Sequence, residues 1–484
     1  MIKYFAYPVK EIPVIANDGM TSLHKIKTES TVSLIVAFVL SGLFFSCQES
    51  KPSLEENEIV VEAPFEMPGI IVPNFTNAPR YPITEFGAEA ANKEKNTRAI
   101  KKAVEKANSA GGGSVIIPKG EWLTGKVHLK SNVNLHLDEG AVLLFSDVPE
   151  DYLPPVRSTW EGMECYNYSP LIYAFKAKNV AITGKGELRA KMDTWEKWFD
   201  RPSGHMENLK RLYNMAAKDV PVEQRQMVND SANFRPQFIQ FNRCNNILIE
   251  GVSIKNSPFW VLHPFMSRNV IIRNINVYAH GHNNDGVDPE MSQNILIENC
   301  VFDQGDDAIA IKAGRNQDAW RLNTPAKNIV IRNCLVKNGH QLVAIGSELS
   351  GGVENVLVEN CEVEDGAKLN HLLFIKTNER RGGYVKNVYM KNIKAGKIDK
   401  GILGIETDVL YQWRNLVPTY ERRLTRIRDI QLEEVVAKEV KFISKIDGEE
   451  ELPVENILLK NVSASVVKDS LNMHEHVLSF YNEE

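Results

Sequence analysis

The segment Asn294-Ile-Leu-Ile-Glu-Asn-Cys-Val-Phe302 carries the pattern that decides the fold. It reads asparagine, apolar, any residue, apolar, any residue, and the same order begins again at Asn299. Alternation with a period of two is typical of β-strands, and asparagine tolerates the left-handed backbone conformation that a sharp corner requires. The segment therefore predicts two short strands joined at a corner.

The same pattern repeats along the second half of the chain. Its seven copies begin at Asn246, Asn269, Asn294, Asn328, Asn355, Asn387 and Asn456. One such unit cannot bury its inner face alone, so successive coils must stack. We therefore expect an all-β, single-domain, right-handed parallel β-helix whose corner asparagines hydrogen-bond from coil to coil. The main alternative, a leucine-rich repeat, lacks its Leu-x-x-Leu-x-Leu signature.

Composition and cysteine usage narrow the class of protein. Hydrophobic residues make up 43% of the 484 residues and charged residues 25%, which is typical of a soluble globular protein. The net charge of −5 gives no reason to expect nucleic acid as a partner. Six cysteines are too few for a disulfide scaffold, and no C-x-x-C pair indicates zinc. Cys300, Cys334 and Cys361 share one position of the repeat, which predicts a buried column.

Segments outside the repeat are expected to cap and decorate the stack. Residues 96–108 have apolar side chains at helical spacing after a polar cap at Asn96, and residues 111–113 are three glycines that end the pattern. This amphipathic helix would cover the open end of the first coil. Residues 191–234 depart from the repeat and predict an inserted loop with helical content. Its aromatic residues either stack on sugar rings or pin the insertion to the body.

The start of the chain resembles an export signal. Residues 31–46 are apolar, follow two lysines and end at Cys47, so residues 1–47 are interpreted as a lipoprotein-type signal peptide with lipidation at Cys47. The alternatives are an ordinary secretory signal and an uncleaved anchor. We expect a tether over 48–79, the β-helix over 80–470 and a tail over 471–484. The protein would then be exported and lipid-anchored to the outer membrane, on its periplasmic or cell-surface side.

Register between coils predicts a cluster of acidic side chains. Asp306 and Asp307 follow the corner Asn294 by 12 and 13 residues, and His340 follows its own corner by 12. A short corner insertion brings Asp285 level with them. Carboxylates this close cannot all ionise cheaply, so at least one should retain its proton. An acid beside a base is what inverting glycoside hydrolysis requires. Solvated turns, or a calcium site, are the alternatives.

These residues lie in motifs that resemble the polygalacturonase family of glycoside hydrolases (family 28). The matching motifs are Asn283-Asn284-Asp285-Gly286-Val287-Asp288, Gly305-Asp306-Asp307, Gly339-His340-Gln341 and Phe374-Ile375-Lys376. The resemblance implies that Asp306 is the general acid and that Asp285 and Asp307 hold the attacking water. It implies that His340 tunes this cluster and that Lys376 binds a substrate carboxylate. It implies no metal and no cofactor.

Further residues are expected to contact substrate. Asn283, Lys312 and Arg381 complete the predicted set of substrate-binding residues. Phe374 departs from the family, which has an arginine there to clamp a uronate carboxylate through two hydrogen bonds. A substitute cation is expected among Arg315, Arg380 and Arg381. A zinc site at His280 and His282, near Asp285, is a weaker alternative because no fourth ligand is evident.

The resemblance implies hydrolysis of pectic polysaccharide, most simply of α-1,4-galacturonosyl linkages from chain ends. Insertions before Asp285, at 313–327 and at 364–372 would close one end of the groove and make the action exo. A rhamnogalacturonan-directed hydrolase of the same family would account for Phe374. A calcium-dependent pectate lyase and a non-catalytic, carbohydrate-binding or adhesive β-helix are competing hypotheses for the function.

Overall fold

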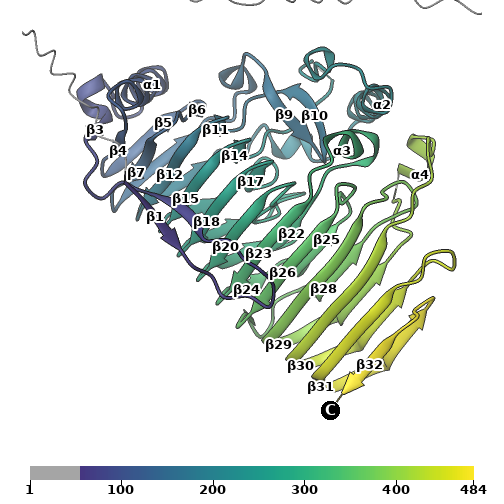
Figure 1. The fold of residues 1–484 in the computed structure, drawn as a ribbon. Coiled ribbons are helices and arrows are strands. Elements are labelled where there is room, and N and C mark those ends of the chain that lie inside the picture. The colour runs from purple at the N-terminus through teal and green to yellow at the C-terminus, as the bar shows by residue number, and fades with distance from the viewer. Residues whose placement is uncertain (1–54, 230, 412, 484) are drawn as a thin grey trace, which may run out of the picture. The chain divides into compact units, whose positions relative to one another are not determined.

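The computed structural model describes residues 55–229, 231–411 and 413–483. The chain winds into a coil in which most strands belong to one continuous parallel sheet, as Figure 1 shows. Each coil contributes up to three strands, and each strand pairs in parallel with its equivalent on the next coil. The prediction of a right-handed parallel β-helix is confirmed. Cys47 and the rest of the expected signal peptide lie outside the described residues.

The strands fall into three ladders that run along the stack. The first ladder contains β3 (Arg80–Pro82), β4 (Gly113–Ile117), β7 (Val133–Leu137), β12 (Lys178–Gly184), β15 (Asn245–Glu250), β18 (Arg268–Arg273), β20 (Gln293–Glu298), β23 (Ala326–Arg332) and β26 (Val353–Glu359). The second contains β5 (Gly120–Thr124), β8 (Ala141–Phe145), β13 (Glu187–Ala190), β16 (Ser253–Lys255), β19 (Asn276–Ala279), β21 (Val301–Gln304), β24 (Leu335–Asn338) and β27 (Glu362–Val363). The third contains β6 (Val127–His128), β11 (Ile172–Phe175), β14 (Ile239–Asn242), β17 (Leu262–Phe265), β22 (Ile309–Ile311), β25 (Gln341–Gly346) and β28 (Leu369–Lys376).

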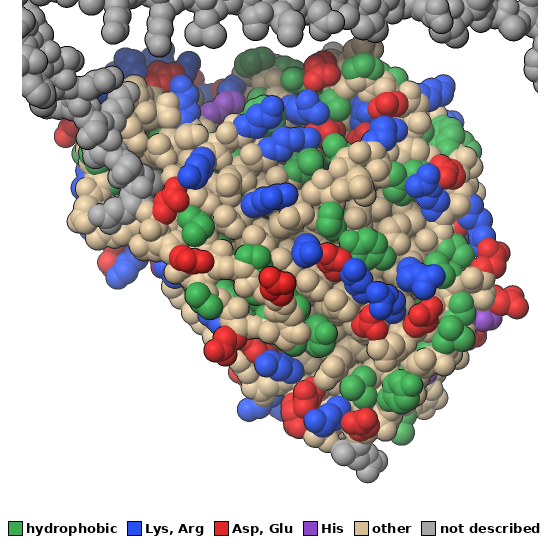
Figure 2. Space-filling model, viewed as in Figure 1, with side chains coloured by type: hydrophobic (Ala, Val, Ile, Leu, Met, Phe, Trp, Pro, Cys, Tyr) green, Lys and Arg blue, Asp and Glu red, His purple; other side chains and the backbone are tan. Residues whose placement is uncertain are grey.

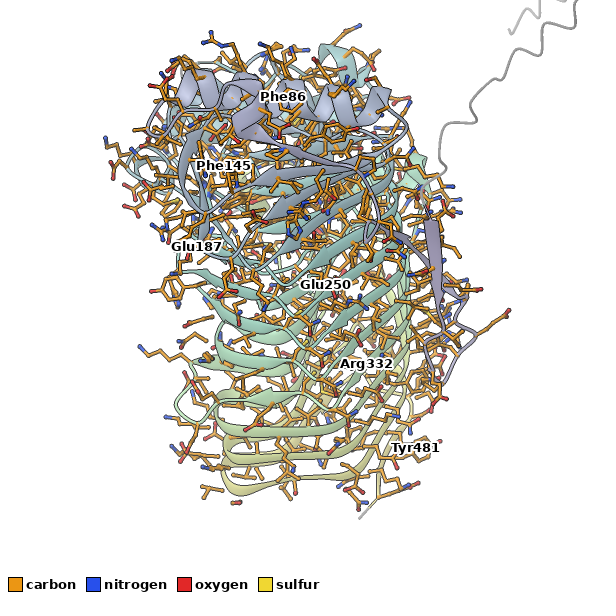
Figure 3. The ribbon with its side chains drawn as sticks, turned by 90° about the vertical axis from the view of Figure 1, so that its left-hand side faces the viewer. Phe86, Phe145, Glu187, Glu250, Arg332 and Tyr481 are labelled. Carbon is orange, nitrogen blue, oxygen red and sulfur yellow. The ribbon has the colours of Figure 1, made fainter. Side chains whose placement is uncertain are left out.

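The last coils run from ladder to ladder without a break. They are β29 (Tyr384–Glu406), β30 (Arg426–Asp447) and β31 (Glu455–Glu475), and the short β32 (Phe480–Glu483) pairs with the first residues of β31. Figure 3 follows the stack from Phe86, beside the first helix, to Tyr481 on the final strand. Residues 471–475 and 480–483, expected to form a tail, instead belong to β31 and β32. This expectation was wrong because Phe480 pairs with Ile457 and packs on the core.

Asparagines form the corner ladder that the repeat predicts. All seven predicted corner asparagines have φ between 54° and 59°. Their side-chain amides hydrogen-bond from coil to coil, for example from Asn294 to Asn269 at 3.3 Å and from Asn328 to Asn294 at 3.1 Å. The ladder also extends upstream to Asn179 and Asn132, 3.1 Å apart. These bonds satisfy polar groups at a turn that must otherwise leave them unpaired.

The core is a column of stacked aliphatic side chains. Ile295, Ile329 and Val356 lie in register on successive coils and are fully buried. The three column cysteines are also buried, and the Cys300 thiol donates to the Glu298 carbonyl at 3.2 Å. They are packing residues, as predicted.

Helix α1 (Lys93–Ser109) closes the first end of the stack. It begins earlier than expected, because the Asn92 side chain caps it by accepting a hydrogen bond from the Lys95 amide. Asn96, predicted as the cap, is instead buried and donates to the Leu123 carbonyl. The predicted apolar face is buried: Ala99, Ile100, Ala103, Val104 and Ala107.

The N-terminal strap, residues 55–75, departs from the expected tether. Strands β1 (Glu55–Ile59) and β2 (Ile70–Asn74) pair antiparallel, and Ile70 and Val72 pack on the outer surface of the first ladder. That surface carries one apolar residue per coil, at a position where the repeat pattern allows any residue. The row is Ala181, Leu248, Ile271, Leu296, Val330 and Leu357. An apolar stripe of this length needs a cover, which the repeat pattern does not predict.

Insertions between the ladders gather on one side of the molecule, near labels β9, β10, α2 and α3 in Figure 1. They include the hairpin β9 (Val156–Trp160) and β10 (Met163–Asn167), helix α2 (Ser203–Ala217), helix α3 (Asn316–Leu322) and helix α4 (Trp413–Leu416). The short 3-10 helices are η1 (Ile83–Phe86), η2 (Pro149–Tyr152), η3 (Glu196–Trp198) and η4 (Val222–Gln224). Over the described ranges, no helix is both long and apolar enough to cross a bilayer.

The insertion at 191–234 contains helical segments, as predicted. Trp195 is fully buried and packs edge-on against Tyr152 and Trp198. These rings therefore pin the insertion to the body. On the face shown in Figure 2, basic and acidic side chains are interspersed, in keeping with the small net charge.

Candidate active site

A cavity of about 320 Å³ lies where the second ladder turns into the third. Asp285, Asp306, Asp307 and His340 line it, so the predicted convergence of these side chains is observed. The Val287–Ile309 bridge and the Gly286 amide, which donates to the Asp307 carbonyl at 3.0 Å, bring Asp285 level with the acid pair. The corner insertion at 281–284 thus restores register, as predicted.

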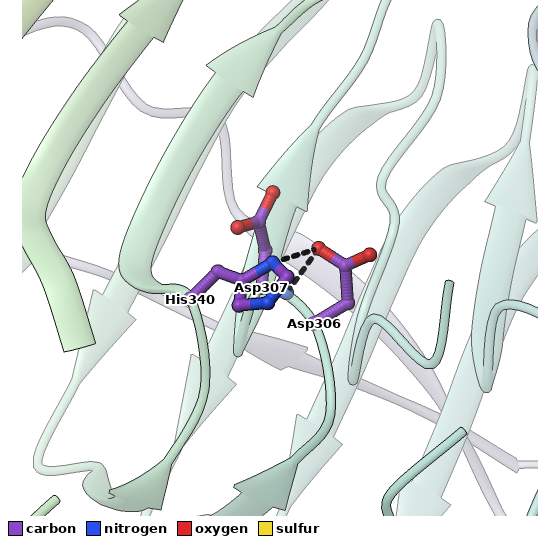
Figure 4. Close-up of side chains that lie close together, drawn as sticks. All are labelled: Asp306, Asp307 and His340. Atoms are coloured by element: carbon purple, nitrogen blue, oxygen red, sulfur yellow. Dashed lines mark hydrogen bonds and ion pairs between the residues drawn. The ribbon is translucent and has the colours of Figure 1, made fainter. Parts of the chain in front are cut away.

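Asp306 and His340 form the contact shown in Figure 4. The His340 Nδ1 atom lies 3.0 Å from the Asp306 Oδ1 atom, and the Asp307 amide donates to the same oxygen at 2.9 Å. The Asp306 side chain is 16% exposed, whereas those of Asp285 and Asp307 are 4% and 1% exposed. Asp306 is therefore the most accessible of the three carboxylates.

Burial and mutual repulsion set the charges of this cluster. Burial, followed by the Asp306 charge, raises the pKa of Asp285 well above its ordinary value. Burial also raises the pKa of Asp307, against the pull of Lys376. Burial would raise the pKa of Asp306 as well, but the hydrogen bond and charge of His340 lower it to about 2. The hydrogen bond to Asp306 in turn raises the pKa of His340.

A retained proton in the acid cluster was predicted, and the pKa of Asp285 agrees with that prediction. The raised pKa values belong to Asp285 and Asp307, whereas the contact with His340 lowers the pKa of Asp306, the expected acid. The three carboxylates interact closely enough to titrate as one unit, so the proton can change position when a ligand alters the His340 contact.

Two buried lysines balance the carboxylates. The Lys376 ammonium donates to Asp307 at 3.0 Å, and Lys312 lies 3.6 Å from Asp285 and 3.4 Å from Glu348. Burial disfavours the charge on Lys312, but the surrounding acids outweigh that effect and raise its pKa well above the ordinary value. Lys312 and Lys376 both line the cavity, where they were predicted to bind substrate.

The remaining predicted substrate residues divide into two groups. Asn283 lines the cavity and accepts hydrogen bonds from Arg201 and Arg235, both at 3.0 Å. Arg381 lies behind the cavity wall, 2% exposed, and donates to the Ser347 carbonyl at 2.6 Å. The structure therefore places Arg381 outside the cavity, because Ser347 lies between them.

Phe374 occupies the place of the family arginine without lining the cavity. Its ring stacks on His371 with centroids 4.5 Å apart, and both rings lie over Gly404, where a side chain would have no room. Of the three candidate substitutes, Arg315 lines the cavity and Arg380 and Arg381 do not. Arg315 pairs with Glu348 and contacts the Tyr213 hydroxyl.

The wall of the cavity includes residues that the sequence did not predict. Glu161 comes from the tip of the β9–β10 hairpin, and Arg201 comes from the 191–234 insertion. These segments share no pattern with the repeat, so register does not place them. The expected contribution of 313–327 is observed through Arg315, whereas residues 364–372 do not line the cavity.

Two groups of side chains carry atoms that commonly bind cations. His280 hydrogen-bonds to Asp303 at 2.6 Å, and His282 lies against the Phe199 carbonyl at 3.3 Å, so they do not converge. Asp306, Asp307 and His340 offer ligand atoms within 4.8 Å of one another. A cation there would compete with His340, which contacts Asp306, and with Lys376, which donates to Asp307.

The fold and this acid cluster define a class of protein, a β-helical glycoside hydrolase. The family described as glycosyl hydrolases family 28 matches residues 222–477, more than half of the chain. The chain therefore belongs to glycosyl hydrolase family 28, and the predicted family is confirmed.

Similar proteins agree with this assignment. A probable polygalacturonase of Vitis vinifera is 29% identical over 400 residues, covering 79% of this chain and 73% of the relative. The exo-poly-alpha-D-galacturonosidase of Dickeya chrysanthemi is 29% identical over 301 residues, 57% of this chain and 49% of that protein. A hyperthermoactive exopolygalacturonase from Thermotoga maritima superposes with a TM-score of 0.78 at 36% identity, covering 86% of this chain and 94% of that structure.

Proposed function

We propose that this glycoside hydrolase cleaves pectic galacturonan from its chain ends, with inversion, and releases galacturonic acid. The observation that carries the proposal is one cavity lined by three carboxylates and by Glu161 and Arg201, which come from inserted segments. Two similar proteins are described as an exo-poly-alpha-D-galacturonosidase and an exopolygalacturonase, which supports the same substrate and direction.

Cationic side chains that can bind an acidic sugar line the cavity. Arg201, Lys312, Arg315 and Lys376 line it together with five carboxylates, with which all four form ion pairs. Guanidinium and ammonium groups in a largely buried cavity bind a carboxylate more strongly than they would in water. On this proposal, the carboxylate of a uronic acid binds to these groups in competition with the acids that they already contact.

The proposed roles of the three carboxylates follow from how exposed each one is. Asp306 is the most exposed of the three carboxylates, so it protonates the departing glycosidic oxygen. Asp285 and Asp307 orient and deprotonate the attacking water. This assignment requires the cluster's proton to move to Asp306 once a bound sugar loosens the His340 contact. His340 therefore acts as a positioning residue that sets the charge of Asp306.

Product analysis tests the proposal. The full chain is incubated with homogalacturonan, rhamnogalacturonan and xylogalacturonan, with and without EDTA, and the products are separated over time. We expect saturated monomer from homogalacturonan from the first time point, with no effect of EDTA. An unsaturated product lost on chelation would indicate a lyase, and early oligomers would indicate endo action.

A second candidate substrate is rhamnogalacturonan, which Phe374 favours. Phe374 stands where the family has an arginine that clamps a uronate carboxylate, and its ring does not line the cavity, so the site lacks that clamp. Release of product from rhamnogalacturonan alone would establish this alternative.

We also propose that Cys47 carries a lipid and anchors the enzyme to the outer membrane, facing the periplasm or the cell surface. The support is the apolar run at 31–46 that ends at Cys47. Metabolic labelling with a palmitate analogue should mark the full chain and not its Cys47→Ser variant. Equal labelling of both would refute the anchor, and protease treatment of intact cells would locate it.

A further inference from the structure

The tip of the β9–β10 hairpin presents one carboxylate to the active-site cavity. Trp160 pairs with Met163, so Glu161 and Gly162 form a two-residue turn. Both have positive φ, 42° and 85°. A hairpin turn with positive φ at both central positions favours asparagine or glycine, and glutamate there is strained. A side chain at Gly162 would crowd Arg315, whose Cβ and amide nitrogen would lie 3.0 Å from the added Cβ.

The turn is rigidly held. The Trp160 ring is fully buried between Phe234 and Phe259, with centroid distances of 4.4 and 4.5 Å and interplanar angles of 17° and 13°. The Arg315 amide donates to the Gly162 carbonyl at 3.0 Å. Stacked rings on one side and a backbone hydrogen bond on the other fix the position of Glu161.

The Glu161 carboxylate is buried and incompletely bonded. Arg201 donates to Oε1 at 3.0 Å, and Arg315 lies 3.3 Å from Oε2 as an ion pair. The residue is 6% exposed, and Oε2 accepts no hydrogen bond from any side chain or backbone group of the described residues. A buried acceptor left in this state is costly, so its geometry suits a donor supplied by a ligand.

Glu161 lines the same cavity as the acids, enters it from a different segment, and is separated from Asp285 by a chain of charged side chains. Four successive ion pairs connect it to Asp285, through Arg315, Glu348 and Lys312. On the proposed function, the sugar bond to be cleaved lies over the acids, so the ring carbon farthest from it faces the wall. In an α-1,4-linked chain that carbon bears a free hydroxyl only at the non-reducing end.

We infer that Glu161 recognises the 4-hydroxyl of the terminal residue, which donates to the Glu161 carboxylate. This inference rests on the proposed function and adds the substrate group that the enzyme recognises at the chain end. A site built to bind a substrate hydroxyl rejects the analogue that lacks it, because the buried acceptor then stays unpaired. The enzyme should therefore act on galacturonan chains whose non-reducing ends were left by hydrolases. It should reject chains left by β-eliminating lyases, because their 4,5-unsaturated ends lack this hydroxyl.

The test compares trigalacturonate with a saturated or a 4,5-unsaturated non-reducing end. For the wild-type full chain we expect kcat/KM to be higher for the saturated trimer by about 10³-fold or more. Glu161→Asn removes the carboxylate but places the favoured residue in the turn, so it should melt at the same temperature as wild type or higher. Its preference for the saturated trimer should fall by about 10- to 100-fold.

The matched control is Glu223→Gln, which alters an exposed glutamate paired with Arg157 outside the cavity. It should keep the wild-type preference. Equal hydrolysis of both trimers by the wild type, or an unchanged preference in Glu161→Asn, would overturn the role of Glu161. Failure of the wild type to hydrolyse the saturated trimer would instead refute the proposed function. If Glu161→Asn does not fold, a second test uses the wild type. It compares inhibition by galacturonate with inhibition by its C4 epimer, glucuronate, and equal inhibition would refute the inference.

Discussion

Asp306 is the residue on which proton donation depends. Replacing it with asparagine keeps the shape of the side chain and removes the titratable proton. We expect Asp306→Asn to lower turnover of homogalacturonan about 10²- to 10⁴-fold, the usual contribution of a general acid. Binding of galacturonate, measured by calorimetry, should remain, because the cavity keeps its lysines and arginines.

The control for this variant is Asp303→Asn, three residues earlier on the same coil. Asp303 bonds to His280 and does not line the cavity, so turnover should not change. Unchanged turnover in Asp306→Asn would remove Asp306 as the acid and leave Asp285, whose pKa burial raises, as the donor.

His340 should make stability depend on pH. Its pKa is raised above 6.5 in the folded protein by the hydrogen bond to Asp306. The pair therefore stabilises the fold fully below about pH 6.5, and this contribution is lost as the pH rises through the higher folded value. His340→Gln should be less stable than the wild type at low pH, and its stability should not decline as the pH rises. Melting temperatures of both proteins between pH 5 and 9 measure this difference.

A double-mutant cycle isolates the pair. In the Asp306→Asn background, His340→Gln should leave the pH dependence of the melting temperature unaltered. A decline that persists in His340→Gln alone would assign the pH dependence to another group.

Register explains which site residues the sequence predicts. Asp285, Asp306, Asp307 and His340 stand at fixed distances from corner asparagines, and stacking turns those distances into contacts. Glu161 and Arg201 come from insertions whose course depends on packing, so no spacing rule places them. Arg381 was misplaced for a related reason: its backbone is near the site, but Ser347 holds its side chain behind the wall.

At the scale of elements, the N-terminal strap is the part of the fold that period-two reasoning misses. The repeat pattern specifies only the residues that point into the core. It does not predict the apolar row on the outside of the first ladder. Ile70 is fully buried against that row. We expect Ile70→Ala to lower the free energy of unfolding by about 2–4 kcal/mol, because it removes buried methyl groups and leaves a cavity.

Urea unfolding followed by tryptophan fluorescence measures this loss. Val60→Ala is the control, since Val60 belongs to the same strap and is 79% exposed. It should change stability by less than about 0.5 kcal/mol. Equal effects of the two substitutions would mean that the strap adds no stability to the β-helix.

At the scale of the whole molecule, the coils form a one-dimensional array whose exposed end needs a cap. Each coil contacts its neighbours, so a defect at one end is expected to spread only locally. Helix α1 covers the first coil, and an uncovered coil presents unpaired strand edges and apolar side chains to other molecules. Damage to the cap should therefore cause association before it causes loss of the distant active site.

Ile100→Asp tests this separation of roles. Ile100 is 1% exposed on the buried face of α1, so a carboxylate there should detach the helix. We expect oligomers by light scattering after size exclusion, with the remaining monomer retaining wild-type turnover per active site. Lys102→Glu, on the exposed face of the same helix, should stay monomeric. Loss of turnover in monomeric Ile100→Asp would show instead that the cap and the catalytic coils, nearly two hundred residues apart in sequence, unfold as one cooperative unit.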